Sequence, residues 1–108
     1  MNISIYYFLK TEHKQQLKLY NFMKKIEIYT TDFCPFCLKA KSLLNKKKIK
    51  FFEIDISDDE ALREKMSAMA NGARSVPQIF ADNIHIGDCD KIHKLDQEKK
   101  LDKLLGLE

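Results

Sequence analysis

The chain has 108 residues, a length that suits one compact domain and leaves little room for two. Hydrophobic residues make up 44% of it, enough for a buried core, and the net charge of +3 is too small to predict general nucleic-acid binding. No apolar run is long enough to cross a bilayer, so we expect neither a nucleic acid nor a membrane among its partners.

Cysteine usage indicates the compartment. Three cysteines are too few, and an odd number, for a small secreted domain held together by disulfides. We therefore expect a reducing compartment, the cytoplasm. We separately expect the protein to be a monomer. In such a compartment a closely spaced cysteine pair is more often catalytic or metal-binding than structural.

Residues 1–22 differ from the rest of the chain. Their short apolar stretch has neither basic residues before it nor a small-residue cleavage site after it, which makes it a poor secretory signal. Met23, two lysines and a strand pattern follow. We expect a domain over residues 23–108, preceded by an extension of unknown role or by an upstream start that translation does not need. Mass spectrometry of the protein expressed from its own gene tests this, and finding the full-length species alone would refute the upstream start.

The domain begins with a strand, a helix and a strand. Apolar residues alternate over 25–30 and predict the first strand, and a second is expected over 51–56. Between them, residues 35–47 are expected to form a helix, because apolar residues recur at spacings of three and four. This stripe comprises Cys37, Ala40, Leu43 and Leu44. A crossover helix between two strands implies that the strands are parallel neighbours.

A second helix is expected after residue 57. Ser57 and Glu60 have the spacing of a capping box, and Asn71-Gly72 supplies a helix end. The expected buried stripe comprises Leu62, Met66, Met69 and Ala70.

The last third of the chain predicts a hairpin and a final helical region. Strands over 76–81 and 84–86 flank Asp82-Asn83, two residues that tolerate the positive φ of a tight loop. The closing helical region, with a last short helix, has as its apolar positions Ile92, Leu95, Leu101, Leu104 and Leu105. The order β-α-β-α-β-β-α predicts an α/β fold with a four-stranded mixed sheet flanked by helices.

Residues 33–38 read FCPFCL, and they lie where the first strand ends and the first helix begins. Cys34 falls at or beside the N-cap, and Pro35 takes the first helical position, where a missing N–H costs nothing. Unpaired backbone N–H groups and the helix dipole therefore point at the Cys34 sulfur. We expect the pKa of this thiol to fall from about 8.5 to between about 3.5 and 7.5, which makes Cys34 a nucleophile at neutral pH.

Cys37 lies one turn further along, on the buried face of the same helix. We expect it to be less ionised and to resolve the mixed disulfide that Cys34 forms. Two alternatives stay open at this point. The thiols could be buried hydrophobes, or they could join Cys89 and His93 in a Cys₃His zinc site.

Two further motifs suit a peptide-like ligand. In SVP, over 75–77, a cis Pro77 would present the backbone of Val76 beside the sulfurs, although a plain strand-initiating proline explains the motif equally well. In GDCD, over 87–90, a helix N-terminus offers N–H groups to a carboxylate, and Asp90 offers a carboxylate to an amine. A simple helix cap accounts for GDCD just as well.

Taken together, CPFC, GARSVPQIF and HIGDCD closely resemble the bacterial-like, dithiol type of the glutaredoxin family, from about residue 24 to the C-terminus. The resemblance implies a thioredoxin-like fold, a cis Pro77, and glutathione as co-substrate with no metal. It implies Cys34 as the nucleophile and Cys37 as the resolving thiol. The glutathione-binding residues that it implies are Phe36, Arg74, Val76, Pro77, Cys89 and Asp90.

The sequence also departs from the family pattern. Family members commonly carry a lysine shortly before the first cysteine, where this chain has Thr31 and Asp32, so we expect Arg74, Lys39 or a more distant lysine to supply a cation. Asp88 replaces the second glycine of the usual GG turn. An anionic side chain there would weaken glutathione binding unless it points away as a helix cap.

The resemblance therefore predicts a glutathione-dependent oxidoreductase that reduces protein disulfides and glutathione mixed disulfides. The alternative is a carrier in which Cys34 and bound glutathione from two chains hold a [2Fe–2S] cluster. A third possibility is a thioredoxin-like protein served by a reductase. The CPFC sequence disfavours both, because cluster carriers usually have CGFS and thioredoxins CGPC.

Overall fold

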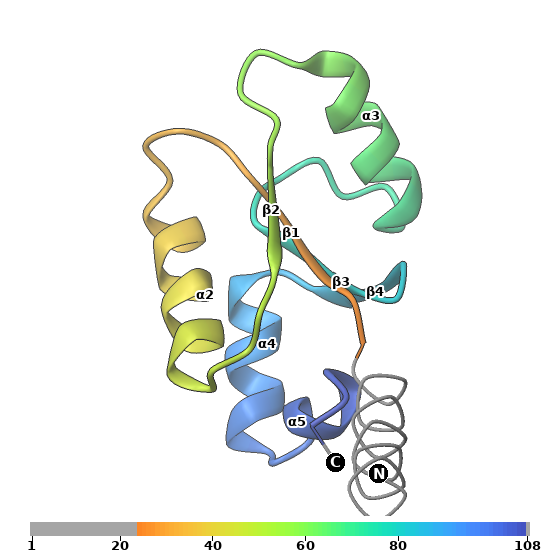
Figure 1. The fold of residues 1–108 in the computed structure, drawn as a ribbon. Coiled ribbons are helices and arrows are strands. Elements are labelled where there is room, and N and C mark those ends of the chain that lie inside the picture. Colours follow the sequence, from red (N-terminus) through yellow and green to blue (C-terminus); the bar gives the residue numbers. More distant parts are fainter. Residues whose placement is uncertain (1–23, 108) are drawn as a thin grey trace, which may run out of the picture.

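The computed structural model describes residues 24–107, so the predicted extension over residues 1–22 lies outside the described part of the chain. Figure 1 shows the elements in the predicted order, with the expected short helix at the end. They are β1 (Ile26–Thr30), α2 (Pro35–Lys46), β2 (Phe52–Asp55), α3 (Glu60–Met69), β3 (Gln78–Ala81), β4 (Ile84–Gly87), α4 (Cys89–Gln97) and α5 (Leu101–Leu104). No helix in this described range is long and apolar enough to span a membrane.

The strands form one mixed sheet in the order β2-β1-β3-β4. β1 pairs in parallel with β2 and antiparallel with β3, and β3 pairs antiparallel with β4. The parallel pair follows from the crossover helix α2, and the antiparallel pair from the tight β3–β4 loop. The four-stranded mixed sheet predicted from the sequence is therefore confirmed.

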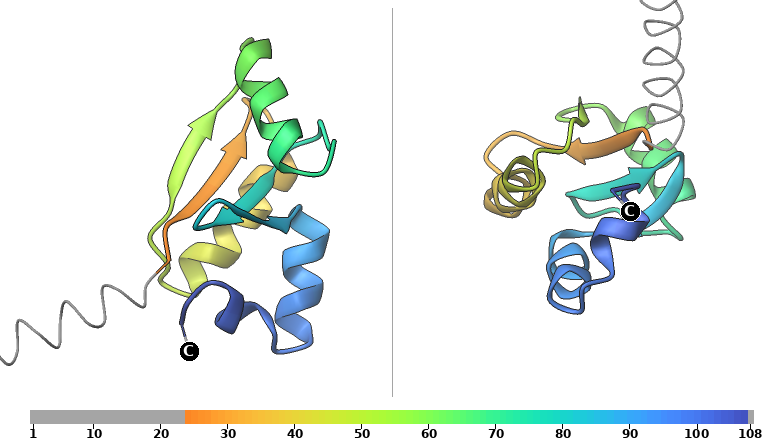
Figure 2. Two further views of the ribbon diagram at one scale, coloured as in Figure 1. Left: turned by 90° about the vertical axis from the view of Figure 1, so that its right-hand side faces the viewer. Right: turned by 60° about the horizontal axis from the view of Figure 1, so that its bottom comes forward.

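Side chains alternate between the two faces of the sheet, and each face has its own core. Ile26 and Ile28 of β1 pack with α2, α4 and α5, whereas Tyr29 packs with Phe80 and α3. Figure 2 shows α2 and α3 on opposite sides of the sheet. With both faces covered, the carboxyl end of β1 is held rigidly where it leads into α2.

The predicted start of α3 is wrong by two residues. Asp59, not Ser57, is the N-cap, and its carboxylate accepts the N–H of Leu62 at 3.0 Å. Ser57 instead bridges the ends of the parallel strands, because its Oγ accepts the N–H of Asp32 and its own N–H is donated to Asp55, both at 2.8 Å. Aspartate caps a helix as well as serine does, so the local pattern did not decide between them.

The hairpin loop is as predicted, since Asp82 and Asn83 have φ of 49° and 66°. Leu104, one of the expected apolar positions of the closing helical region, differs from its neighbours in exposure. It is 37% exposed, whereas Leu101 and Leu105 are buried.

Candidate active site

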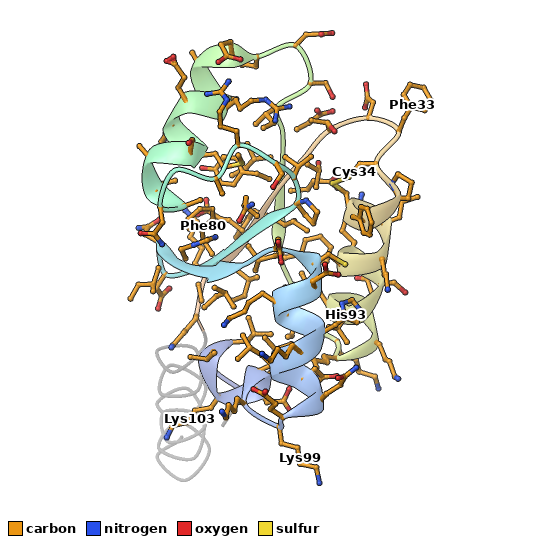
Figure 3. All side chains as sticks on the ribbon, turned by 180° about the vertical axis from the view of Figure 1, so that it is seen from behind. Phe33, Cys34, Phe80, His93, Lys99 and Lys103 are labelled. Carbon is orange, nitrogen blue, oxygen red and sulfur yellow. A yellow bond between two sulfur atoms is a disulfide. The ribbon has the colours of Figure 1, made fainter. Side chains whose placement is uncertain are left out.

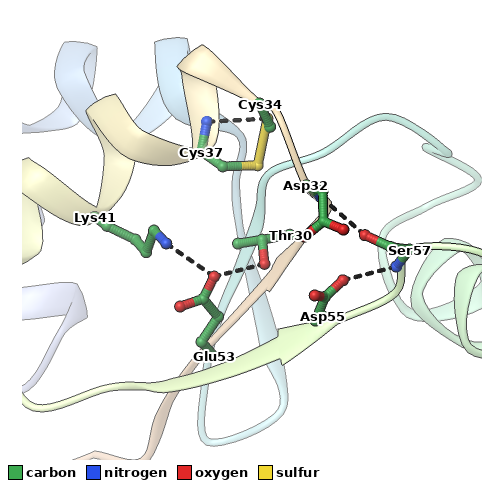
Figure 4. Close-up of polar contacts among 8 residues, drawn as sticks. All are labelled: Thr30, Asp32, Cys34, Cys37, Lys41, Glu53, Asp55 and Ser57. Carbon is green, nitrogen blue, oxygen red and sulfur yellow. Dashed lines mark hydrogen bonds and ion pairs between the residues drawn. A yellow bond between two sulfur atoms is a disulfide. The ribbon is translucent and has the colours of Figure 1, made fainter.

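The two cysteines of CPFC lie at the junction of β1 and α2 (Figures 3 and 4). Cys34 is the N-cap of α2 and Pro35 is its first residue, as predicted. The Cys34 Sγ accepts the N–H of Cys37 at 3.1 Å. The two sulfurs form a disulfide, and the Cα atoms are 5.1 Å apart. The first turn of the helix thus places an N–H donor directly on the Cys34 sulfur.

The two sulfurs differ in access to solvent. Cys34 is partly exposed, while Cys37 is 2% exposed and packs on the buried face of α2. An incoming disulfide can therefore reach Cys34 and not Cys37. This asymmetry fits the predicted division between an attacking and a resolving thiol.

The loop before β3 brings backbone against the cysteine pair. The Val76–Pro77 peptide bond is cis, as the resemblance implies, and the Val76 carbonyl oxygen lies 3.9 Å from the Cys34 Sγ. Gln78 fixes this loop, since its Nε2 donates to the Ser75 carbonyl at 3.1 Å and its Oε1 lies 2.7 Å from the His85 Nε2. Burial lowers the pKa of His85, so at neutral pH its ring is uncharged.

A pocket of about 220 Å³ opens beside this loop. Its lining brings together five of the predicted glutathione-binding residues with two others: Phe36, Val76, Pro77, Cys89 and Asp90, together with Ser75 and Asp88. The predicted residues lie in three separate segments of the chain, and the sheet gathers them at one end. Ser75 was missed although it belongs to the SVP motif, because that motif was interpreted through its proline alone.

The N-terminus of α4 forms one wall of the pocket. Asp88 is its N-cap and accepts the N–H of Lys91 at 2.9 Å, so the carboxylate that departs from the family pattern acts as a helix cap. Gly87 precedes it with φ of 147°. A Cβ at this position would lie 2.4 Å from Cγ of Lys91, which explains the glycine. Asp90 lies in the first turn of α4 and is exposed to solvent.

Cys89 is the first residue of α4, and it is only 3% exposed. Burial raises the pKa of its thiol. Its Sγ lies 3.6 Å from the His93 Nδ1, which in turn lies 2.9 Å from the Cys89 carbonyl oxygen. Within residues 24–107, His, Cys, Asp and Glu side chains form no group of three or more that could hold a metal ion.

Arg74 lies apart from the pocket lining. Its guanidinium group pairs with the Glu60 carboxylate on α3, and its carbonyl oxygen accepts a hydrogen bond from Arg63. The structure therefore brings the other predicted residues together and leaves this one to the side. The sequence places Arg74 next to the SVP motif, but it does not show that the guanidinium group pairs with Glu60.

Fold and site together define a thioredoxin-like protein with a redox-active cysteine pair. The Glutaredoxin family model matches residues 26–86. A probable glutaredoxin of Synechocystis sp. is 56% identical over 81 residues, which cover 75% of this chain and 92% of the relative. Glutaredoxin 3 of Escherichia coli is 46% identical over 83 residues, which cover 77% of this chain and 99% of the relative. A solved glutaredoxin from Brucella melitensis has a TM-score of 0.69 and 43% identity, covering 78% of this chain and 90% of that chain.

These matches show that the chain belongs to the glutaredoxin family. It is accordingly a thiol–disulfide oxidoreductase with a thioredoxin-like fold, and the Cys34–Cys37 disulfide is consistent with a redox-active pair. Glutaredoxins as a family use glutathione as a substrate.

Proposed function

We propose that this protein uses glutathione to reduce protein disulfides and glutathione mixed disulfides. The observation that carries the proposal is the position of Cys34, whose partly exposed Sγ accepts the Cys37 N–H where α2 begins. The positive end of the helix dipole and this N–H favour a thiolate, which is the nucleophile in disulfide exchange.

In the first route, the Cys34 thiolate attacks the glutathione sulfur of a protein–glutathione mixed disulfide. A Cys34–glutathione disulfide forms, and the protein leaves as a thiolate. A second glutathione thiolate then attacks the glutathione sulfur held on Cys34. Glutathione disulfide forms, the Cys34 thiolate is restored, and glutathione supplies both electrons.

In the second route, the substrate is a disulfide within or between proteins. Cys34 attacks one sulfur, which breaks the substrate's S–S bond, releases the first substrate thiolate and forms a mixed disulfide. Cys37 then attacks the Cys34 sulfur after losing its proton. This step releases the second substrate thiolate and forms the Cys34–Cys37 disulfide. Two glutathione molecules reduce that disulfide and leave as glutathione disulfide.

The pocket beside Cys34 supports glutathione as the reductant. A tripeptide could pair with the backbone of Val76, as an added strand does. Its carboxylate suits the N–H groups at the start of α4, and its ammonium group suits the exposed Asp90 carboxylate. Contact between Phe36 and the ligand, and the role of Arg74, remain predictions. Arg74 would have to exchange Glu60 for a glutathione carboxylate.

The test is glutathione-coupled reduction of a small mixed disulfide by Cys34→Ser and Cys37→Ser proteins. We expect Cys34→Ser to lose at least about a thousandfold in kcat/KM, because no other accessible thiolate replaces the nucleophile. Cys37→Ser should keep a substantial part of the activity, since the first route does not use Cys37. Equal losses in the two variants would contradict the first route.

A visible absorption spectrum distinguishes the proposed oxidoreductase from the cluster-carrier alternative. Purified under anaerobic conditions, the proposed oxidoreductase should lack the visible absorption of a [2Fe–2S] centre. A stable cluster at one per two chains would favour the alternative. We further propose that the protein acts as a monomer in the cytoplasm on glutathionylated proteins, which the size of the purified species and fractionation of the source cells test.

A further inference from the structure

A second hollow, of about 310 Å³, lies beside the disulfide. Its lining includes residues Cys34 and Cys37 and shares no residue with the pocket proposed for glutathione. We call it the acidic hollow, and it is lined by Thr30, Thr31, Asp32, Phe33, Cys34, Cys37, Leu38, Lys41, Glu53 and Asp55. Any polypeptide that forms a disulfide with Cys34, or that leaves when Cys34 attacks the glutathione bound to it, has part of its surface next to this hollow at that step.

The apolar part of the hollow is unusually open to solvent. Phe33, directly before Cys34, is 101% exposed, and Leu38 is 64% exposed. Figure 3 shows Phe33 projecting outward at the end of the molecule that carries Cys34. Phe33 also has φ of 54°, a conformation that phenylalanine seldom adopts. Exposed apolar side chains beside a reactive atom are typical of an interaction site.

The polar part of the hollow is acidic, with the carboxylates of Asp32, Glu53 and Asp55 against the single ammonium of Lys41. Glu53 is already paired, because it accepts hydrogen bonds from Lys41 at 2.9 Å and from Thr30 at 2.7 Å. Asp32 and Asp55 remain as the charges that have no cation partner among the ion pairs of the described residues. The hollow therefore presents two carboxylates that form no ion pair, and the Lys41 charge also acts on Asp55.

Ser57 holds the Asp55 carboxylate and the backbone of Asp32. Its hydroxyl oxygen accepts the Asp32 N–H and its own N–H is donated to Asp55, so the ends of β1 and β2 are tied together (Figure 4). Hydrogen bonds from Ser57 lower the pKa of Asp55, which keeps its carboxylate ionised at neutral pH.

The glutathione pocket and the acidic hollow share no lining residue, so glutathione and a polypeptide can occupy them separately. Glutathione in its proposed pocket would lie against Val76, which borders Cys34, and against the start of α4. A polypeptide that exchanges its disulfide with Cys34 needs the remaining side of Cys34. In an extended chain each residue advances the backbone by about 3.3–3.8 Å. The residues next to the substrate's cysteine are therefore within reach of the acidic hollow.

We propose that the acidic hollow is a subsite for the polypeptide segment around the substrate's disulfide cysteine, and that it selects segments with basic residues beside that cysteine. Phe33 and Leu38 would contact the apolar parts of the segment, and Asp32 and Asp55 its ammonium or guanidinium groups. This inference rests on the proposed function and adds the class of protein substrate.

The test compares two glutathionylated hexapeptides that differ only in lysine or glutamate on both sides of the cysteine. The readout is the ratio of their kcat/KM values in the glutathione-coupled assay, which cancels changes in overall activity. We expect the lysine peptide to be preferred by about tenfold at low ionic strength, since two exposed ion pairs contribute severalfold each. The preference should shrink in 0.5 M salt, an ionic strength at which the Debye length is only about 4 Å.

Asp32→Asn/Asp55→Asn should reduce the ratio to about twofold or less. Asp32→Asn alone should lower it about threefold, and it keeps the backbone N–H donated to Ser57 if the double variant folds poorly. The matched control is Asp58→Asn/Glu64→Gln, which removes the same charge from exposed positions outside the hollow and should keep the tenfold ratio.

Equal turnover of the two peptides by the wild type would overturn the subsite, as would a preference that survives in Asp32→Asn/Asp55→Asn. A preference lost equally in the control pair would also overturn it, because general charge attraction would then explain the result. A wild type that turns over no glutathionylated substrate, the small one included, would instead overturn the proposed function itself.

Discussion

Two cysteines of this protein lie at helix starts and have opposite properties. Cys34 is the N-cap of α2, and Cys89 is the first residue of α4, after its N-cap Asp88. The Cys34 sulfur is partly exposed and accepts a backbone N–H. The Cys89 sulfur is buried, and burial raises the pKa of its thiol.

The difference shows that closeness to a helix start does not by itself activate a thiol. At α2 the sulfur is the capping acceptor, so the Cys37 N–H of the first turn points at it. At α4 the Asp88 carboxylate takes that role, and the Cys89 side chain packs into the core with Ile92. The capping acceptor benefits from the helix dipole, while the next residue pays the cost of desolvation.

The largest expected effect concerns the turn that positions α4. Gly87→Ala places a Cβ 2.4 Å from Cγ and 2.6 Å from Cβ of Lys91, at a φ that alanine disfavours. We expect a loss of about 2 kcal/mol in the free energy of unfolding, measured by urea denaturation. The neighbouring pocket should also be disturbed, so KM for glutathione should rise. Gly72→Ala also has positive φ but meets no atom within 4 Å, and it should cost less. Equal losses for the two glycines would contradict the steric explanation.

The next-largest effect concerns Asp88, for which two substitutions distinguish its role as the cap of α4 from the effect of its charge. Asp88→Ala removes the acceptor for the Lys91 N–H and should lower the free energy of unfolding by about 1 kcal/mol. Asp88→Asn keeps an acceptor oxygen and should be nearly as stable as the wild type. Because it also removes a negative charge from the pocket lining, we expect KM for glutathione to fall by about twofold. An unchanged KM would show that the Asp88 charge does not oppose glutathione.

The smallest expected effect is that of Cys89 on the free energy of unfolding at alkaline pH. Its folded-state pKa is raised, so the protonated thiol contributes stability that is fully present below the unfolded pKa of about 8.5 and is lost as pH rises from there through the raised folded-state pKa. In the oxidised protein the other two cysteines are in the disulfide and do not titrate. Unfolding of wild type and Cys89→Ala between pH 7.5 and 9.5 should therefore give a shallower fall for the variant. Parallel curves would count against this assignment.

Much of the fold and part of the site could be predicted from the sequence because local rules coincide there. Pro35 after Cys34 starts a helix with few alternatives, and Asp82-Asn83 suits a two-residue hairpin loop. Where two nearby residues satisfy the same rule, the pattern did not decide, as with Ser57 and Asp59.

Contacts between distant segments were less predictable. The pairing of Arg74 with Glu60 depends on how α3 packs beside the loop before β3. The acidic hollow joins Asp32 and Asp55, which are 23 positions apart in the sequence. A signal for it did exist, since both residues fall at the carboxyl ends of adjacent parallel strands, and such ends meet at the same edge of a sheet.

The most direct test of the account is the pH dependence of alkylation in the reduced protein, with Cys34 and Cys89 resolved by peptide mapping. We predict that Cys34 reacts half-maximally well below the value of about 8.5 for free cysteine, and that Cys89 does so above it. If Cys34 instead titrates at or above the free-cysteine value, the sulfur is not held as a thiolate by the start of α2, and the proposed chemistry has no nucleophile at neutral pH.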